Sequence, residues 1–134
     1  MEYLYLFLDG GKMFIKRIIE FAKQDLEADI LVSDGQFSLL CYAFPVKEVS
    51  IGQHISALLS YGCSEVVKSD IQVLSIKKLQ SYYAYSLTAL VHSRKKNIVR
   101  LGDLYMELDR ALPKDIFEGD FVSFSVIRFD VSFS

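Results

Sequence analysis

The sequence predicts an α+β fold, in which one N-terminal amphipathic helix packs on a mainly antiparallel, curved or barrel-like sheet of about seven strands. Apolar residues recur at helical spacing over residues 12–27. Apolar runs rich in β-branched and aromatic residues, separated by turn residues, fill most of the remaining chain. The length of 134 residues suits one domain, 1–134, with a single core.

The N-terminal part is predicted to form a strand and then the helix. The run Tyr3–Leu8 is apolar and aromatic, as in a buried strand, and Asp9-Gly10-Gly11 ends it. An apolar stripe of this kind has to lie on another element, for which a sheet is the obvious partner. The residues that form the stripe are Phe14, Ile15, Ile18, Ile19, Ala22 and Leu26.

A β-hairpin is predicted next. The apolar runs Asp29–Ser33 and Gln36–Phe44 are separated by Asp34-Gly35. Asp-Gly between two such runs is typical of a type I′ turn, which needs positive φ at both central residues. Pro45 ends the second strand, because proline donates no hydrogen bond to a strand ladder.

The pattern over residues 52–61 fits either a short helix or a strand, and we favour the strand. Further strands are expected at Glu65–Lys68, Ile71–Lys77, Tyr83–Val91, Ile98–Leu108 with a bulge or bend at Gly102, and Phe121–Phe133. The last 80 or so residues would suit a small oligonucleotide-binding (OB) type barrel, although no motif fixes that topology.

The net charge of −2 conceals an uneven distribution. Residues 1–67 carry five basic and nine acidic side chains, and residues 101–134 carry three basic and seven acidic ones. Between them, residues 68–100 carry seven basic side chains and one acidic one. Separate patches of opposite charge are therefore possible on the folded surface, provided that folding keeps the blocks apart.

Several classes of protein are excluded or disfavoured. The longest apolar runs have six residues, whereas a membrane-spanning helix needs about 20. The early Glu2 and the lack of early lysine or arginine disfavour a secretory signal, so we expect a cytoplasmic protein. Cys41 and Cys63 then stay reduced and inert.

No catalytic or cofactor signature is present, so we expect a non-enzymatic protein without metal or cofactor. The sequence lacks a Gly-x-Ser-x-Gly elbow, a P-loop and a dinucleotide fingerprint. Its only cysteines and histidines, at positions 41, 54, 63 and 92, do not have the close spacing of zinc ligands. The sequence does not indicate the oligomeric state.

An acidic series near the C-terminus is the predicted partner-binding site. It consists of Asp103, Glu107, Asp109, Asp115, Glu118 and Asp120. An acidic surface steers a basic protein partner by charge complementarity. Our best functional hypothesis is an immunity-type inhibitor that binds and blocks a cognate toxin, a basic nuclease.

The alternative hypothesis is an oligonucleotide-binding β-barrel that uses the basic middle segment. Single-strand binders combine positive charge with aromatic side chains on a sheet. The residues concerned are Lys77, Lys78, Tyr83, Tyr85, Arg94, Lys95 and Lys96. The isoelectric point of about 5.6 disfavours a dedicated nucleic-acid binder.

Overall fold

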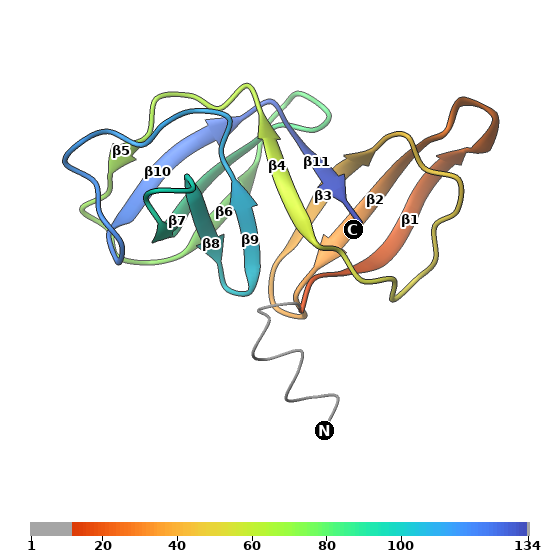
Figure 1. Cartoon of the computed structure of the whole chain (residues 1–134), viewed down its shortest axis with the longest axis horizontal. Helices are drawn as coiled ribbons and strands as arrows, with labels where there is room; N and C mark the ends of the chain where they lie inside the picture. The colour runs from red at the N-terminus through yellow and green to blue at the C-terminus, as the bar shows by residue number, and fades with distance from the viewer. Residues whose placement is uncertain (1–11, 134) are drawn as a thin grey trace.

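The computed structural model describes residues 12–133, whose regular secondary structure is almost entirely β (Figure 1). A single mixed sheet contains eleven strands in the described part of the chain, and the order along it is β1-β2-β3-β11-β4-β9-β8-β7-β10-β5, with β6 paired to β7. The strands are β1 (Phe14–Ala22), β2 (Glu27–Ser33), β3 (Ser38–Ala43), β4 (Ala57–Tyr61), β5 (Val67–Lys68), β6 (Ser75–Lys78), β7 (Tyr85–Ser93), β8 (Ile98–Leu101), β9 (Leu104–Glu107), β10 (Phe121–Val126) and β11 (Arg128–Ser132).

The predicted α+β class is wrong, because the segment expected to form the helix is a bulged strand. Residues 12–27 form β1, one turn of 3₁₀ helix (Lys23–Asp25) and the start of β2. The pairing of β1 with β2 shifts register between Ile15 and Arg17 and again between Ile18 and Glu20. Each bulge adds one residue, so that Ile15, Ile18 and Phe21 pack on the core at every third position. This spacing imitates a helix, although the backbone is extended.

The last strand joins the two halves of the sheet. β11 lies between β3, to which it is parallel, and β4, to which it is antiparallel. β4 in turn pairs in parallel with β9, and the other pairings are antiparallel. Figure 1 shows β4 and β11 in the centre, with β1–β3 on one side and β5–β10 on the other. The sheet is therefore mainly antiparallel, as expected, but it has eleven strands instead of about seven, and two of its pairings are parallel.

The inward-facing residues of these strands form the hydrophobic core. In β3 the buried side chains are Leu39, Cys41 and Ala43, which alternate with partly exposed ones. Phe129 of β11 and Leu58 of β4 are fully buried where the two halves meet. Apolar side chains from both ends of the chain therefore share one hydrophobic cluster.

The predicted hairpin is confirmed, but its turn differs from the prediction. β2 and β3 pair up to Ser33 and Ser38, so the connection has four residues. Gly35 has φ of +97°, whereas Asp34 does not have positive φ, which excludes the type I′ turn. Instead, the Asp34 carboxylate accepts hydrogen bonds from the N–H groups of Gln36 (2.9 Å) and Phe37 (2.7 Å).

The other predicted strands exist with changed boundaries. β4 confirms a strand in the second half of the ambiguous segment 52–61. Gly102 is part of a two-residue hairpin turn between β8 and β9, and Ile127 separates β10 from β11. The expected strand Tyr3–Leu8 lies outside the described residues. Among the described residues, no helix has the length and apolar character required to cross a membrane.

Candidate functional site

Asp109, one of the acidic residues predicted to bind a partner, makes hydrogen bonds within the protein itself. Its carboxylate accepts hydrogen bonds from the Ser60 hydroxyl (2.6 Å), the Gly62 N–H (2.8 Å) and the Cys63 N–H (3.1 Å). Desolvation opposes ionisation, but these hydrogen bonds outweigh it and hold the pKa of Asp109 below its ordinary value. Asp109 thus fastens the segment that leaves β4 to the end of β9.

Acidic residues of the loop between β9 and β10 contact basic residues from other parts of the chain. Glu118 accepts a hydrogen bond from the backbone N–H of Arg94 (3.0 Å), which lowers the pKa of Glu118. The Arg94 guanidinium donates to the Ile116 carbonyl (2.9 Å) and lies over the Phe117 ring (5.3 Å). Asp120 accepts from the Phe117 N–H (2.9 Å) and lies 3.6 Å from the Lys68 ammonium.

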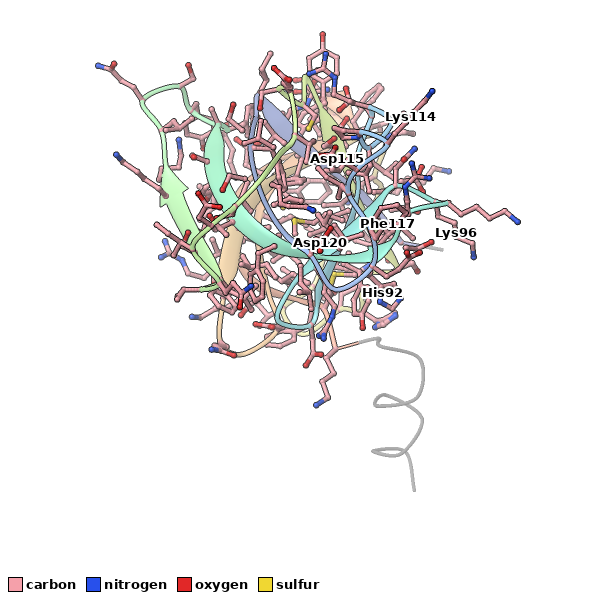
Figure 2. All side chains as sticks on the ribbon, turned by 90° about the vertical axis from the view of Figure 1, so that its left-hand side faces the viewer. His92, Lys96, Lys114, Asp115, Phe117 and Asp120 are labelled. Atoms are coloured by element: carbon pink, nitrogen blue, oxygen red, sulfur yellow. The ribbon has the colours of Figure 1, made fainter. Side chains whose placement is uncertain are left out.

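The structure brings half of the acidic series together at one end of the molecule. Asp115, Glu118 and Asp120 belong to the loop between β9 and β10, and Figure 2 shows Asp115 and Asp120 at the same end as Lys96 and Lys114. Asp103 lies in the β8–β9 turn, 3.8 Å from Lys12, and Glu107 is an exposed residue at the end of β9. The end of the molecule that carries Asp115 and Asp120 therefore has mixed charge instead of a purely acidic patch.

The two tyrosines of the basic middle segment are engaged within the fold, whereas most of its lysines are exposed. Tyr85 is buried, and its hydroxyl oxygen accepts the Leu40 N–H at 2.8 Å. The Tyr83 hydroxyl donates to Asp29 at 2.6 Å, and the Lys78 ammonium donates to the Leu79 and Ser81 carbonyls. The exposed side chains of this set are Lys77, Lys78, Lys95 and Lys96. Tyr83 and Tyr85 thus do not form a free pair of stacking platforms for bases.

A different cluster, which sequence reasoning missed, lies on the outer face of β3, β11 and β4. Arg128 of β11 is directly opposite Tyr61 of β4 in the sheet register. Its guanidinium lies 4.7 Å from the Tyr42 ring centroid and 4.9 Å from that of Tyr61. Asp130, two residues further along the same strand, binds it through both carboxylate oxygens, at 2.6 and 3.1 Å.

Further aromatic rings continue this cluster. Phe44 stacks on Tyr42 with a centroid distance of 6.4 Å, and Tyr83 meets the edge of Tyr42 at 5.9 Å. Tyr82 contacts Tyr83 at 4.7 Å. We call this cluster the aromatic surface, and it consists of Tyr42, Phe44, Tyr61, Tyr82, Tyr83 and Arg128. Phe44, Tyr61 and Tyr82 are 57%, 53% and 53% exposed.

An open hollow of about 110 Å³ adjoins this surface. Cross-strand pairing places Glu20 opposite Asp29 and Ala22 opposite Glu27. The remaining lining residues are Ala28 and Tyr83. We call this feature the acidic hollow.

One pattern in the sequence would have indicated part of the aromatic surface. Leu39, Cys41 and Ala43 alternate along the chain with Leu40, Tyr42 and Phe44, which places two aromatic rings on the face opposite the core. The packing of Tyr82 and Tyr83 against that face joins residues about 40 positions apart, and local sequence does not specify such a contact.

The described residues offer little support for metal or thiol chemistry. No group of three or more histidine, cysteine, aspartate or glutamate side chains in residues 12–133 is arranged to hold a metal ion. Burial raises the pKa of Cys41 far above its usual range, and burial together with Asp109 raises that of Cys63 to about 11. Both thiols therefore remain protonated and weakly nucleophilic at neutral pH.

Comparison with known proteins gives no match: neither a family model, nor a curated protein, nor a solved structure resembles the chain significantly. Function therefore has to be inferred from the residues of the site itself.

Proposed function

We propose that the chain is a non-enzymatic protein-binding module that docks its partner through the aromatic surface. The observation that carries this proposal is the group of exposed aromatic rings held around Arg128 on the outer face of β3, β11 and β4. Tyrosine, phenylalanine and arginine are enriched in protein interfaces, and tyrosine and arginine are over-represented among binding hot spots.

The aromatic surface is already ordered in the free chain. The Tyr42 hydroxyl donates to Glu27 at 2.9 Å, and the Tyr82 and Tyr83 hydroxyls both donate to Asp29. Asp130 fixes the orientation of Arg128. Because these side chains lose little rotamer freedom on binding, the entropic cost of association is reduced.

The edges of the sheet are less suitable for a partner than this face. Two bulges interrupt β1, β5 has only two residues, and β6 carries Lys77 and Lys78. Bulges, short strands and lysines all disfavour addition of a further strand at an edge. A partner that docks on a sheet face avoids these obstacles.

The finer hypothesis, an immunity-type inhibitor of a basic toxin in the cytoplasm, remains a prediction. Such an inhibitor needs acidic side chains that attract a basic partner, and Glu20, Glu27 and Asp29 adjoin the aromatic surface. The docking site, however, moves from the C-terminal acidic series to the aromatic surface.

Two phenylalanines provide a matched test. Phe44, in the aromatic surface, is 57% exposed, and Phe117, in the loop of mixed charge, is 55% exposed. Wild type, Phe44→Ser and Phe117→Ser would each be immobilised and used to capture proteins from the producing cells. The partner would then be purified, and its affinity for each variant measured by calorimetry.

We expect Phe44→Ser to weaken binding of one defined protein at least tenfold, which is about 1.4 kcal/mol, while Phe117→Ser binds like wild type. Loss of binding only in Phe117→Ser would place the interface in the β9–β10 loop and refute the proposal. Equal affinity of all three proteins would refute it too.

A further inference from the structure

The turn that joins β1 to β2 is built in the same way as the turn that joins β7 to β8. Leu26 ends the first turn and Asn97 ends the second, and they are the two non-glycine residues with positive φ in the described part of the chain, at 57° and 56°. The Leu26 carbonyl accepts the Val46 N–H at 2.9 Å, and the Asn97 carbonyl accepts the Leu108 N–H at the same distance. One local structure therefore occurs in both halves of the molecule.

A second pair of turns matches just as closely, at Gly52 and Gly119, where φ is +85° and +88°. The Gly52 N–H donates to the Ile15 carbonyl at 2.7 Å, and the Gly119 N–H donates to the Val91 carbonyl at 3.0 Å. In return, the Ile15 and Val91 N–H groups each donate, at 2.9 Å, to the carbonyl of the residue that follows the glycine. The side chain of that residue closes each turn by accepting a backbone N–H from three positions earlier, at 3.0 and 2.9 Å.

The strand topology repeats as well. Each half contains a three-stranded meander, β1–β2–β3 or β7–β8–β9, and a fourth segment that returns to pair with its first strand. In the N-terminal half, β3 pairs in parallel with β11 from the C-terminal half. In the C-terminal half, β9 pairs in parallel with β4 from the N-terminal half, and both crossing strands lie in the centre of Figure 1. Each half therefore completes its sheet with a strand from the other.

The loop 69–74, between β5 and β6, connects the two halves. Its Ile71 is 69% exposed, the largest fraction among the large apolar side chains of residues 12–133, and its Val73 is 63% exposed. β10 and β7 lie between β5 and β6, so the loop crosses three strand spacings of about 4.8 Å, or about 14 Å along the sheet. Because Ile71 and Val73 do not pack on the core, the loop can extend without the loss of their contacts.

We propose that residues 13–68 and 75–132 are two copies of one unit, and that two molecules of the chain form a dimer in which each N-terminal half pairs with the C-terminal half of the other molecule. The loop 69–74 is the hinge of this exchange. Since β11 already fills the place between β3 and β4, the same strand of a second copy fits there with the same contacts. Each aromatic surface then takes Tyr42 and Tyr61 from one molecule and Arg128 from the other. This goes beyond the proposed function, which requires a single chain.

Shortening the hinge tests the exchange. Deletion of residues 70–73 joins Ser69 directly to Leu74, and neighbouring Cα atoms are only about 3.8 Å apart, too short a distance to pass β10 and β7 within one molecule. Replacement of the same four residues by four serines keeps the length and is the matched control. Light scattering would compare the mass of each protein with the 15.3 kDa of one chain.

We expect wild type and the serine variant to be monomers at micromolar concentration, because the intact hinge gives the two halves an effective concentration of about 1 mM. The shortened chain should have about twice the mass of a monomer. In a mixture of ¹³C-labelled and unlabelled shortened chains, nuclear Overhauser contacts should join Arg128 of one molecule to the Tyr42 ring of the other. A shortened chain that folds as a monomer, or a dimer in which these contacts remain within one molecule, overturns the proposal.

A second experiment decides the question if the shortened chain does not fold. Ile15 and Val91 occupy matching buried positions, so Ile15→Asp and Val91→Asp each place an uncompensated charge in the core of one half. The two variants would be unfolded in urea, mixed and refolded together. The intact halves of different molecules should then pair and restore native amide signals that neither variant shows alone. If mixing restores no native signals, the proposed exchange is wrong.

Discussion

Replacement of Asp109 by alanine should destabilise the fold more than its surface position suggests. The substitution removes three hydrogen bonds to a charged acceptor, from Ser60, Gly62 and Cys63. Such bonds contribute about 1.5–3 kcal/mol each when shielded, but Asp109 is exposed and water replaces part of the loss. We therefore expect a total loss of about 2 kcal/mol, compared with less than about 0.5 kcal/mol for Asp115→Ala, an exposed residue further along the same loop.

Urea unfolding of the three proteins measures this difference. With a slope of about 2 kcal/mol per molar, the midpoint of Asp109→Ala should fall by about 1 M. Because the folded state lowers the pKa of Asp109, its stabilisation is complete above the unfolded pKa of about 3.9 and is lost as the pH falls through the folded value. The gap between wild type and Asp109→Ala should thus narrow in acid. If Asp109→Ala unfolds at the wild-type midpoint at neutral pH, the proposed role of this carboxylate is wrong.

Three other substitutions test the packing that positions the site, and each can be followed by thermal unfolding, where 1 kcal/mol corresponds to about 4 °C. Gly102→Ala should cost about 2 kcal/mol, because φ is +63° and the new Cβ would lie 2.6 Å from an Asp34 carboxylate oxygen; an unchanged melting temperature would contradict this. Tyr85→Phe should cost about 1–3 kcal/mol, since the Leu40 N–H loses its acceptor, and a more stable variant would show that this bond is dispensable. Phe129→Ala should cost about 3–5 kcal/mol because its ring is fully buried, and a loss below 1 kcal/mol would mean that the core collapses around it.

The fold prediction succeeded where strand patterns were regular and failed where a bulge altered them. The alternation in β7 and the Asp34-Gly35 hairpin were readable from local sequence. In β1, two register shifts moved the inward positions from every second to every third residue, which resembles a helix. The insertion of β11 between β3 and β4 depends on contacts between distant segments, so the local pattern did not predict it.

The predicted site residues differ from the aromatic surface for a similar reason. Sequence proximity grouped the acidic series, but folding uses Asp109 and Glu118 as hydrogen-bond acceptors for backbone groups. The aromatic surface combines β3, β4, β11 and the segment before β7, which sequence spacing does not bring together. The acidic and basic blocks of the sequence meet in this region, because the Asp120 carboxylate lies 3.6 Å from the Lys68 ammonium.

The most direct test of the aromatic docking site is to map the bound partner onto the chain. The ¹⁵N-labelled protein would be mixed with the purified, deuterated partner, and cross-saturation would identify the amides that lie against it. The aromatic surface predicts the strongest effects at Tyr42, Phe44, Tyr61 and Tyr82, with weak effects over residues 109–120. Strong effects confined to residues 109–120 would contradict the account and return the interface to the acidic series.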